Sequence, residues 1–110
     1  MKQLPLSIDF EFEIRVTKKN NKGVTAPAEG LIGWQVHIST TKGGTSVDAT
    51  LTQILIERPE AGGLYSAVFE TDDLITYLAS FNQVWFVITK PGDVTSYSLP
   101  YIVVPLAHGN

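Results

Sequence analysis

The sequence predicts an all-β fold in which six to seven antiparallel strands form a two-layer sandwich with one short corner helix. Three observations lead to this prediction. Apolar and polar residues alternate with period two in several segments, which is the pattern of half-buried strands. Clusters of glycine, proline and asparagine separate these segments about every ten residues. The chain has 110 residues, the common size of one domain. A small barrel is the alternative closure for such strands.

The first strand is predicted over residues 6–16, where six apolar residues alternate with polar ones. This alternation gives the strand one buried face and one solvated face. Residues 1–5 precede the pattern and are expected to form a tail, as are residues 106–110 at the other end of the domain. The polar residues 18–30 are expected to form a loop.

The second strand is predicted over residues 31–40, followed by a hairpin loop at the glycine pair 43–44. In residues 46–57, the phase of the apolar positions changes near Thr52 and Gln53. Such a change indicates either a bulge or a strand that passes from one sheet to the other. The predicted inward face of the second strand comprises Ile32, Trp34, Val36 and Ile38, with His37 on the opposite face.

One segment departs from strand periodicity. After a turn at 58–63 and a strand at 64–70, the apolar residues of 71–79 recur one helical turn apart. Thr71 is suited to cap a helix, and the two aspartates that follow it favour the positive end of the helix dipole. The sequence therefore predicts one or two helical turns at a corner of the fold.

The last two strands are predicted at 83–89 and 95–104, joined by a turn that contains Pro91 and Gly92. Pro100 interrupts the second of them. Because proline cannot donate a hydrogen bond to a neighbouring strand, we expect this strand to lie at a sheet edge or to bend at that point.

These two strands are apolar on both faces. Residues 84–88 are five consecutive apolar residues, and residues 101–104 repeat the pattern. One apolar set must point away from the core, and monomers rarely leave such a patch bare. Either the corner helix at 72–79 covers the patch or another protein chain does. The contact surface is predicted at Trp85, Val87, Tyr101 and Val103, while the opposite phase of the last strand would present Ile102 and Val104.

The sequence contains no recognisable motif for catalysis or metal binding. Asp9, Glu11 and Glu13 fit a solvated strand face whose charges discourage edge-to-edge pairing. His37 and His108 have no second ligand at metal-binding spacing, and the chain has no cysteine. We therefore expect no catalytic residue, no cofactor and no metal site.

Composition narrows the choice of partners. The formal charge is −3, and the eight Lys and Arg residues are spread along the chain, so no basic stripe is expected to hold nucleic acid. No apolar stretch approaches the ~18 residues of a membrane span. The start of the chain shows no apolar leader segment, so we expect cytoplasmic synthesis.

Two motifs resemble Ig-like and transthyretin-like β-sandwich modules. They are Gly-Leu-Ile-Gly-Trp-Gln-Val at 30–36 and Gly-Gly-Leu-Tyr-Ser-Ala-Val-Phe-Glu at 62–70, where a G-x-Y-x-A-x-F strand follows a turn. The short helix at 72–79 is similar to the transthyretin-like arrangement. Modules of this kind occur in tailed-phage virion proteins, in necks, tails and capsid decorations. The chain lacks the Cys–Trp–Cys core of classical Ig domains and the hydrolase motifs of enzymatic transthyretin relatives, so the resemblance implies no catalysis.

These observations favour a non-enzymatic structural or assembly protein, such as a phage virion component. It would form a homo-oligomer or dock on a larger shell through its C-terminal hairpin. The alternative is a carbohydrate- or ligand-binding module that uses the aromatic residues Trp85, Tyr97 and Tyr101 as a stacking platform. An enzyme is the third hypothesis, and no catalytic pair in the sequence supports it.

Overall fold

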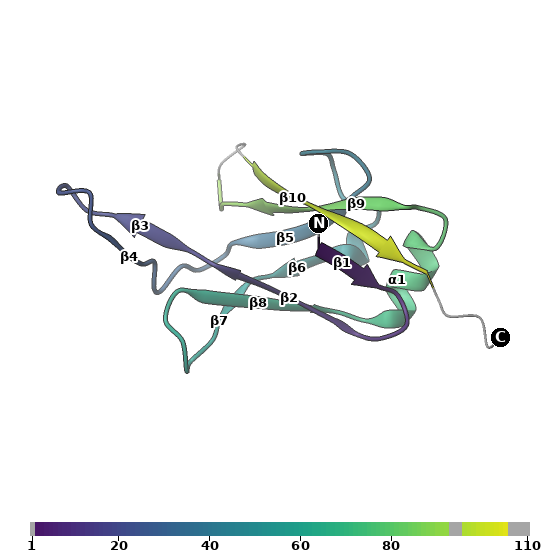
Figure 1. Ribbon diagram of the computed structural model, residues 1–110, viewed down its shortest axis with the longest axis horizontal. Coiled ribbons are helices and arrows are strands. Elements are labelled where there is room, and N and C mark those ends of the chain that lie inside the picture. The colour runs from purple at the N-terminus through teal and green to yellow at the C-terminus, as the bar shows by residue number, and fades with distance from the viewer. Residues whose placement is uncertain (1, 93–95, 106–110) are drawn as a thin grey trace.

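Strands make up most of the regular structure (Figure 1). The computed structural model describes residues 2–92 and 96–105 of the chain. Its single α-helix within these residues is α1 (Thr71–Leu78), and a short 3₁₀ turn spans Ala49–Leu51. The predicted all-β class is confirmed. The strands are β1 (Lys2–Pro5), β2 (Phe10–Arg15), β3 (Thr17–Lys19), β4 (Thr25–Pro27), β5 (Gln35–Ser39), β6 (Thr52–Ile54), β7 (Ile56–Glu57), β8 (Leu64–Phe69), β9 (Gln83–Thr89) and β10 (Ser96–Val104).

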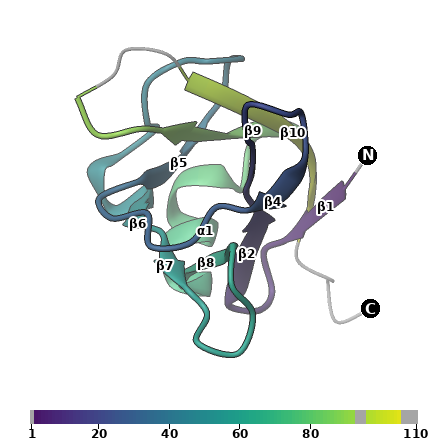
Figure 2. The ribbon, with the colours of Figure 1, turned by 90° about the vertical axis from the view of Figure 1, so that its left-hand side faces the viewer.

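The strands form two larger sheets and one separate ribbon. Sheet A has the order β1-β10-β9-β5-β6, sheet B has the order β2-β8-β7, and β3 pairs with β4. All strand pairs are antiparallel except β1 and β10, which run parallel. Figure 2 looks along the molecule and shows β5, β9 and β10 on one side, β2, β7 and β8 on the other, and α1 between them.

Aromatic rings join the two sheets. Phe12 of β2 stacks on Phe86 of β9 with ring centroids 4.9 Å apart. Phe69 of β8 meets the same Phe86 ring edge-on at 5.6 Å. Phe86 lies at the centre of this cluster because β9 is the middle strand of sheet A. The core contains mainly alternate residues of the facing strands, as period-two patterning predicts: Leu4, Phe12, Val36, Ile38, Tyr65, Ala67, Phe69, Val84, Phe86, Ile88, Tyr101 and Val103.

Helix α1 contributes to the core at one end of the sheets. Leu74 and Leu78, one turn apart as predicted, are fully buried. The predicted cap residue Thr71 is instead the first helical residue. Its N–H donates to the Asp9 carboxylate at 2.9 Å, and its hydroxyl donates to the carbonyl of Leu6 at 2.5 Å. The helix is therefore capped by a residue far away in the sequence, which a local motif cannot reveal.

The N-terminal segment differs from the prediction in two ways. Residues 2–5 are not a tail, because β1 pairs with β10 from Lys2 opposite Tyr101 to Pro5 opposite Val104. The predicted strand over 6–16 begins only at Phe10, since the chain crosses from sheet A to sheet B between Pro5 and Phe10. Alternation persists through this crossing, so periodicity alone overestimated the strand. The predicted tail at 106–110 lies outside the described residues.

The predicted polar loop at 18–30 is in part a hairpin. β3 and β4 pair from Thr17 opposite Pro27 to Lys19 opposite Thr25. The Asn20 side chain closes the turn by accepting the backbone N–H groups of residues 22 and 24 at 2.8 and 3.0 Å. Figure 1 shows this ribbon extending away from the two sheets. We call residues 17–27 the arm.

The phase change predicted in 46–57 is a change of sheets. β6 pairs with β5 in sheet A, and β7 pairs with β8 in sheet B. The change occurs at Leu55, two residues beyond the predicted position, where Leu55 is buried and its N–H donates to the carbonyl of Trp34 at 2.8 Å. The predicted strand at 46–51 is irregular and ends in the 3₁₀ turn.

The C-terminal hairpin has the predicted strands, with Thr95 outside the described residues. β10 lies between β1 and β9, but β1 pairs only with the part of β10 from Tyr101 to Val104. Residues 96–100 of β10 therefore have a strand neighbour on one side only, within the part of the chain that the structure describes. Pro100 occupies the last position of this edge, in agreement with its missing N–H.

Candidate association surfaces

The register of β9 and β10 decides which side chains face away from the core. Phe86 is fully buried in the core, so its neighbours Trp85 and Val87 point to the outer face of sheet A. Across the hairpin, Trp85 lies opposite Pro100 and Val87 lies opposite Ser98. Trp85 and Val87 therefore both point to the outer face, as the sequence predicted.

The other two predicted contact residues face the core. Tyr101 has an exposed fraction of 3%, Val103 is buried as well, and both belong to the core cluster. The ring of Tyr101 lies 4.5 Å from that of Phe86, and burial raises the pKa of its hydroxyl. The prediction that both residues join Trp85 on the outer face is wrong. The alternative phase holds, in which Ile102 points outwards with an exposed fraction of 43%.

Loop 40–48 covers part of this outer face. Val87 has an exposed fraction of 1% although it lies outside the core cluster. The imidazole Nε2 of His37, the register partner of Val87, lies 2.8 Å from the carbonyl oxygen of Gly44. This contact folds the loop back over sheet A, and Figures 1 and 2 both show the loop on the side of β9 away from sheet B. Loop 40–48, rather than helix 72–79, therefore lies on the outer face beside the buried Val87.

Part of the outer face of the hairpin remains open. Pro100 and Ile102 are exposed, and Trp85 is half-buried. We call these three residues the hairpin face.

A more exposed apolar surface lies where the chain changes sheets. Ile54 and Ile56 flank the buried Leu55 and have exposed fractions of 58% and 67%, and Ile32 reaches 87%. All three border one shallow groove of about 430 Å³. β6 and β7 are the outermost strands of sheets A and B in the described chain, so the groove runs along one side of the molecule. We call these three isoleucines the isoleucine flank.

Ile32 was predicted on the inward face together with Trp34. That prediction is wrong, because the chain between them is not a strand: Gly33 has a φ of +83°. Leu31 is half-buried instead, and its N–H donates to the hydroxyl of Tyr65 at 3.0 Å. Left-handed glycines at both ends of this segment, Gly30 and Gly33, thus interrupt the alternation, and Leu31 rather than Ile32 turns towards the core.

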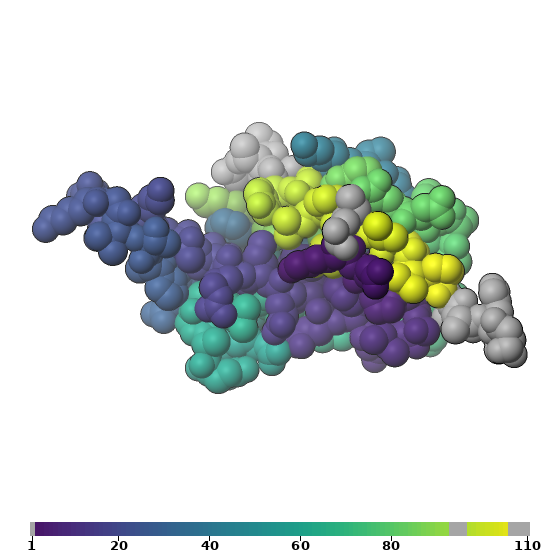
Figure 3. Space-filling model, in the orientation of Figure 1, coloured from purple at the N-terminus to yellow at the C-terminus, as the bar shows by residue number. Residues whose placement is uncertain are grey.

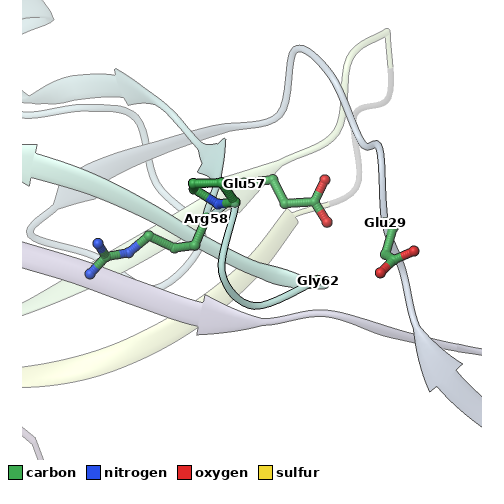
Figure 4. Close-up of a pocket in the computed structure, with 5 residues that line it drawn as sticks. Glu29, Glu57, Arg58 and Gly62 are labelled. Atoms are coloured by element: carbon green, nitrogen blue, oxygen red, sulfur yellow. The ribbon is translucent and has the colours of Figure 1, made fainter.

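A polar pocket of about 290 Å³ lies next to the turn before β8 (Figure 4). The Glu57 carboxylate accepts the N–H groups of Gly30 and Gly63, each at 2.9 Å. Both hydrogen bonds lower the pKa of Glu57 below its usual value, and the bond from Gly63 contributes more than the bond from Gly30. Figure 4 shows Glu29 across the pocket and the Arg58 side chain directed away from it. Glu57 therefore acts as a clamp between two loops.

Arg58 forms ion pairs with three carboxylates at the outer face of sheet B. Its guanidinium lies 3.1 Å from Glu11, 3.0 Å from Glu13 and 3.5 Å from Glu60. The hydrogen bond that Arg58 donates to Glu13 and the charge of Glu11 raise the pKa of Arg58. Arg58 thus pairs with more carboxylates than its single charge neutralises, while Lys2 borders a hollow with Glu11 and Glu13 and Arg15 lies on the same exposed face of β2. We call Glu11, Glu13 and Glu60 the acidic face.

A groove of about 630 Å³ lies between the sheets, along the part of β10 that β1 does not reach. Trp34, Ile88 and Leu99 contribute to its apolar lining, and the exposed ring of Tyr97 lies at its margin. Trp34, predicted as core, is half-buried and packs against the core while facing this groove.

The remaining residues considered for chemistry have structural contacts. Asp72 and Asp73 lie in the first turn of α1, and Asp9 caps that helix. His37 holds loop 40–48, and His108 lies outside the described residues. Among the described residues, no three His, Cys, Asp or Glu side chains lie close enough together to hold a metal ion.

No helix in the described part of the chain has the length and apolarity needed to cross a membrane. Comparisons with known protein families, with curated proteins and with solved structures give no match to this chain.

Proposed function

We propose that this chain is a non-enzymatic structural protein that associates, through apolar surface left open by its fold, with copies of itself or with a larger protein shell. The isoleucine flank carries this proposal. Its three side chains are each more than half exposed and border one groove, whereas the exposed apolar residues of a monomer are normally scattered.

The position of the flank favours a protein as the partner. β6 and β7 are short edge strands, and an edge strand presents backbone groups to which another chain can bind. The groove is shallow and lies along the side of the molecule, so a flat protein surface can cover all three isoleucines at once. The hairpin face of Trp85, Pro100 and Ile102 offers a second, smaller contact.

The use of carboxylates supports the non-enzymatic part of the proposal. Glu57 is held by two backbone N–H groups, and Asp9 caps α1. The Asp48 carboxylate accepts the N–H and the hydroxyl of Thr50, and the backbone bond contributes most to the lowered pKa of Asp48. Each of these carboxylates is therefore engaged in a structural contact.

The resemblance to Ig-like modules of tailed-phage virions suggests which assembly this is. In this proposal the two facing sheets are an Ig-like sandwich, and the chain is an accessory protein of a neck, tail or capsid. A repeated shell supplies many copies of one surface, which suits a small chain with an open apolar side.

Sedimentation velocity over a concentration series tests the proposal. At about 1 M salt, where contacts between charged groups are screened, we expect the unmodified chain to associate and the Ile54→Ser/Ile56→Ser variant to remain a monomer. Val68→Ser is the matched control, because it removes one exposed apolar residue from the outer face of β8. Trp85→Ser/Ile102→Ser measures the separate contribution of the hairpin face. An unmodified chain that stays monomeric at the highest concentration contradicts self-association.

The groove with Trp34 and Tyr97 favours a second candidate, a ligand- or carbohydrate-binding module. In a Trp85→Phe background, Trp34 is the remaining tryptophan, so its fluorescence reports on the groove. Binding of a sugar should change this fluorescence, and Tyr97→Ala should abolish the change. An unchanged spectrum with a panel of oligosaccharides rejects the carbohydrate version of this candidate.

A further inference from the structure

The arm, residues 17–27, is exposed along its whole length. Every residue in it is solvent-exposed, including Val24. Figures 1 and 3 show it projecting from one end of the molecule, with no other part of the chain beside its tip. A two-stranded ribbon without a buried face is marginally stable in water by itself. The arm therefore lacks the stabilising contacts that the other strands find within the chain.

The arm and the rest of the chain carry opposite charge. Lys18, Lys19 and Lys22 lie in the arm, which contains no Asp or Glu. The rest of the chain contains the other five Lys and Arg residues and all eleven Asp and Glu residues. Its formal charge is therefore −6, whereas that of the arm is +3. Charge complementarity of this kind steers association and selects partners.

This charge distribution favours a second copy over nucleic acid as the partner of the arm. A polyanion that approached three lysines would be repelled by the acidic remainder of the same molecule. A second copy, in contrast, presents carboxylates to the arm. On the acidic face, Glu11, Glu13 and Glu60 lie together around the guanidinium of Arg58. That face lies on β2 and the turn after β7, on surface that remains exposed.

We infer that the arm of one copy docks on the acidic face of another copy. This inference rests on the proposed assembly function and assigns it a second, electrostatic contact. The two contacts respond differently to salt. Screening weakens the arm contact, whereas contact through the isoleucine flank is apolar and persists at high ionic strength.

Two complementary variants test the inference in the Ile54→Ser/Ile56→Ser background, which removes the flank contact. The arm variant carries Lys18→Gln, Lys19→Gln and Lys22→Gln, and the face variant carries Glu11→Gln, Glu13→Gln and Glu60→Gln. Each variant lacks one half of the contact, so each alone should be monomeric. Mixed together, they should form a 1:1 complex that weakens roughly tenfold or more between about 0.15 M and about 1 M salt.

A matched control separates the position of the lysines from net charge. Lys42→Gln/Lys90→Gln removes charge from two exposed lysines outside the arm and should weaken the contact less per lysine than the arm variant does. Unmodified chain provides a measurement without folding risk: trypsin should cut at the arm lysines more slowly in concentrated protein at low salt than in dilute protein.

Three results overturn the inference. The first is a mixture of folded arm and face variants that stays monomeric. The second is an equal effect per lysine of the control lysines and the arm lysines. The third is arm-dependent binding of duplex DNA with no arm-dependent self-association. None of these depends on the isoleucine flank, so a failure of the arm contact leaves the proposed function to its own test.

Discussion

Phe12 lies face to face with Phe86, with ring planes only 11° apart and centroids separated by 4.9 Å. One ring comes from β2 in sheet B and the other from β9 in sheet A, so this pair joins the two sheets at the middle of the core. Phe10, Phe69 and Tyr101 also contact Phe86. The stability of the fold should therefore depend strongly on the side chain of Phe86.

Truncation of Phe86 should cause a large loss of stability. Phe86→Ala removes the ring that four others contact and leaves a cavity, so we expect the free energy of unfolding to fall by about 3–5 kcal/mol. Urea unfolding followed by circular dichroism measures this change. The control is Val68→Ala on the exposed face of β8, with an expected loss of about 0.5 kcal/mol or less. Equal losses for the two variants would contradict the central position of Phe86.

The hydroxyl of Tyr65 should stabilise the segment that leads to the isoleucine flank. It donates to the carbonyl of Ala28 at 2.6 Å and accepts the N–H of Leu31 at 3.0 Å, while the Tyr65 side chain is fully buried. Tyr65→Phe leaves both backbone groups without this partner, so we expect a loss of about 1–3 kcal/mol in unfolding free energy. Tyr97→Phe removes an exposed hydroxyl and should change it by less than about 0.5 kcal/mol. Chemical denaturation of both variants distinguishes these outcomes.

Two glycines with similar backbone conformation should tolerate alanine differently. Gly63 and Gly23 have φ values of +82° and +79°. A Cβ on Gly63 would lie 2.8 Å from the Cβ of Pro27 and 3.0 Å from the carbonyl oxygen of Val16, whereas a Cβ on Gly23 would meet nothing within 4 Å. Both substitutions strain the backbone, but only Gly63→Ala adds a steric clash. Its loss of unfolding free energy should exceed that of Gly23→Ala by about 1–3 kcal/mol, and a thermal melt of each compares them.

The clamp formed by Glu57 should give stability that depends on pH. Its folded-state pKa is lowered below the ordinary 4.5 because two N–H groups donate to the carboxylate. The contribution is therefore fully present above pH 4.5 and is lost as the pH falls through the lower, folded-state pKa. Glu57→Gln should reduce the melting temperature at neutral pH and should flatten its decrease between neutral and acidic pH. Parallel melting curves of the two proteins across this range would show that the clamp is not the titrating contact.

The burial of the C-terminal hairpin was predictable from the sequence, but the segment that covers it was not. Five consecutive apolar residues correctly indicated that both faces of β9 leave water, because β9 is the central strand and Val87 is covered from outside. The identity of the cover was not predictable, since loop 40–48 is held by a contact between His37 and the backbone of Gly44. The sequence allowed two phases for β10, and the prediction chose the one with Tyr101 and Val103 outwards. The packing of Tyr101 against Phe86 selects the other.

The isoleucine flank was missed for a different reason. The phase change in 46–57 predicted correctly that a strand could change sheets, and β6 and β7 do so at Leu55. At such a crossing the residues on either side of the buried one point outwards, and Ile54 and Ile56 follow that rule. Ile32 joins them because it lies between the left-handed glycines Gly30 and Gly33, a backbone conformation that period-two counting does not include.

Amide hydrogen exchange as a function of protein concentration tests most directly whether the isoleucine flank is where this chain associates. Backbone amides of residues 30–33 and 52–57 should exchange more slowly in concentrated than in dilute protein, and Ile54→Ser/Ile56→Ser should remove the difference. Residues 71–78 of α1, which belong to neither proposed contact, serve as the internal reference and should exchange alike at both concentrations. Association without added protection at 30–33 and 52–57 would contradict the proposed surface.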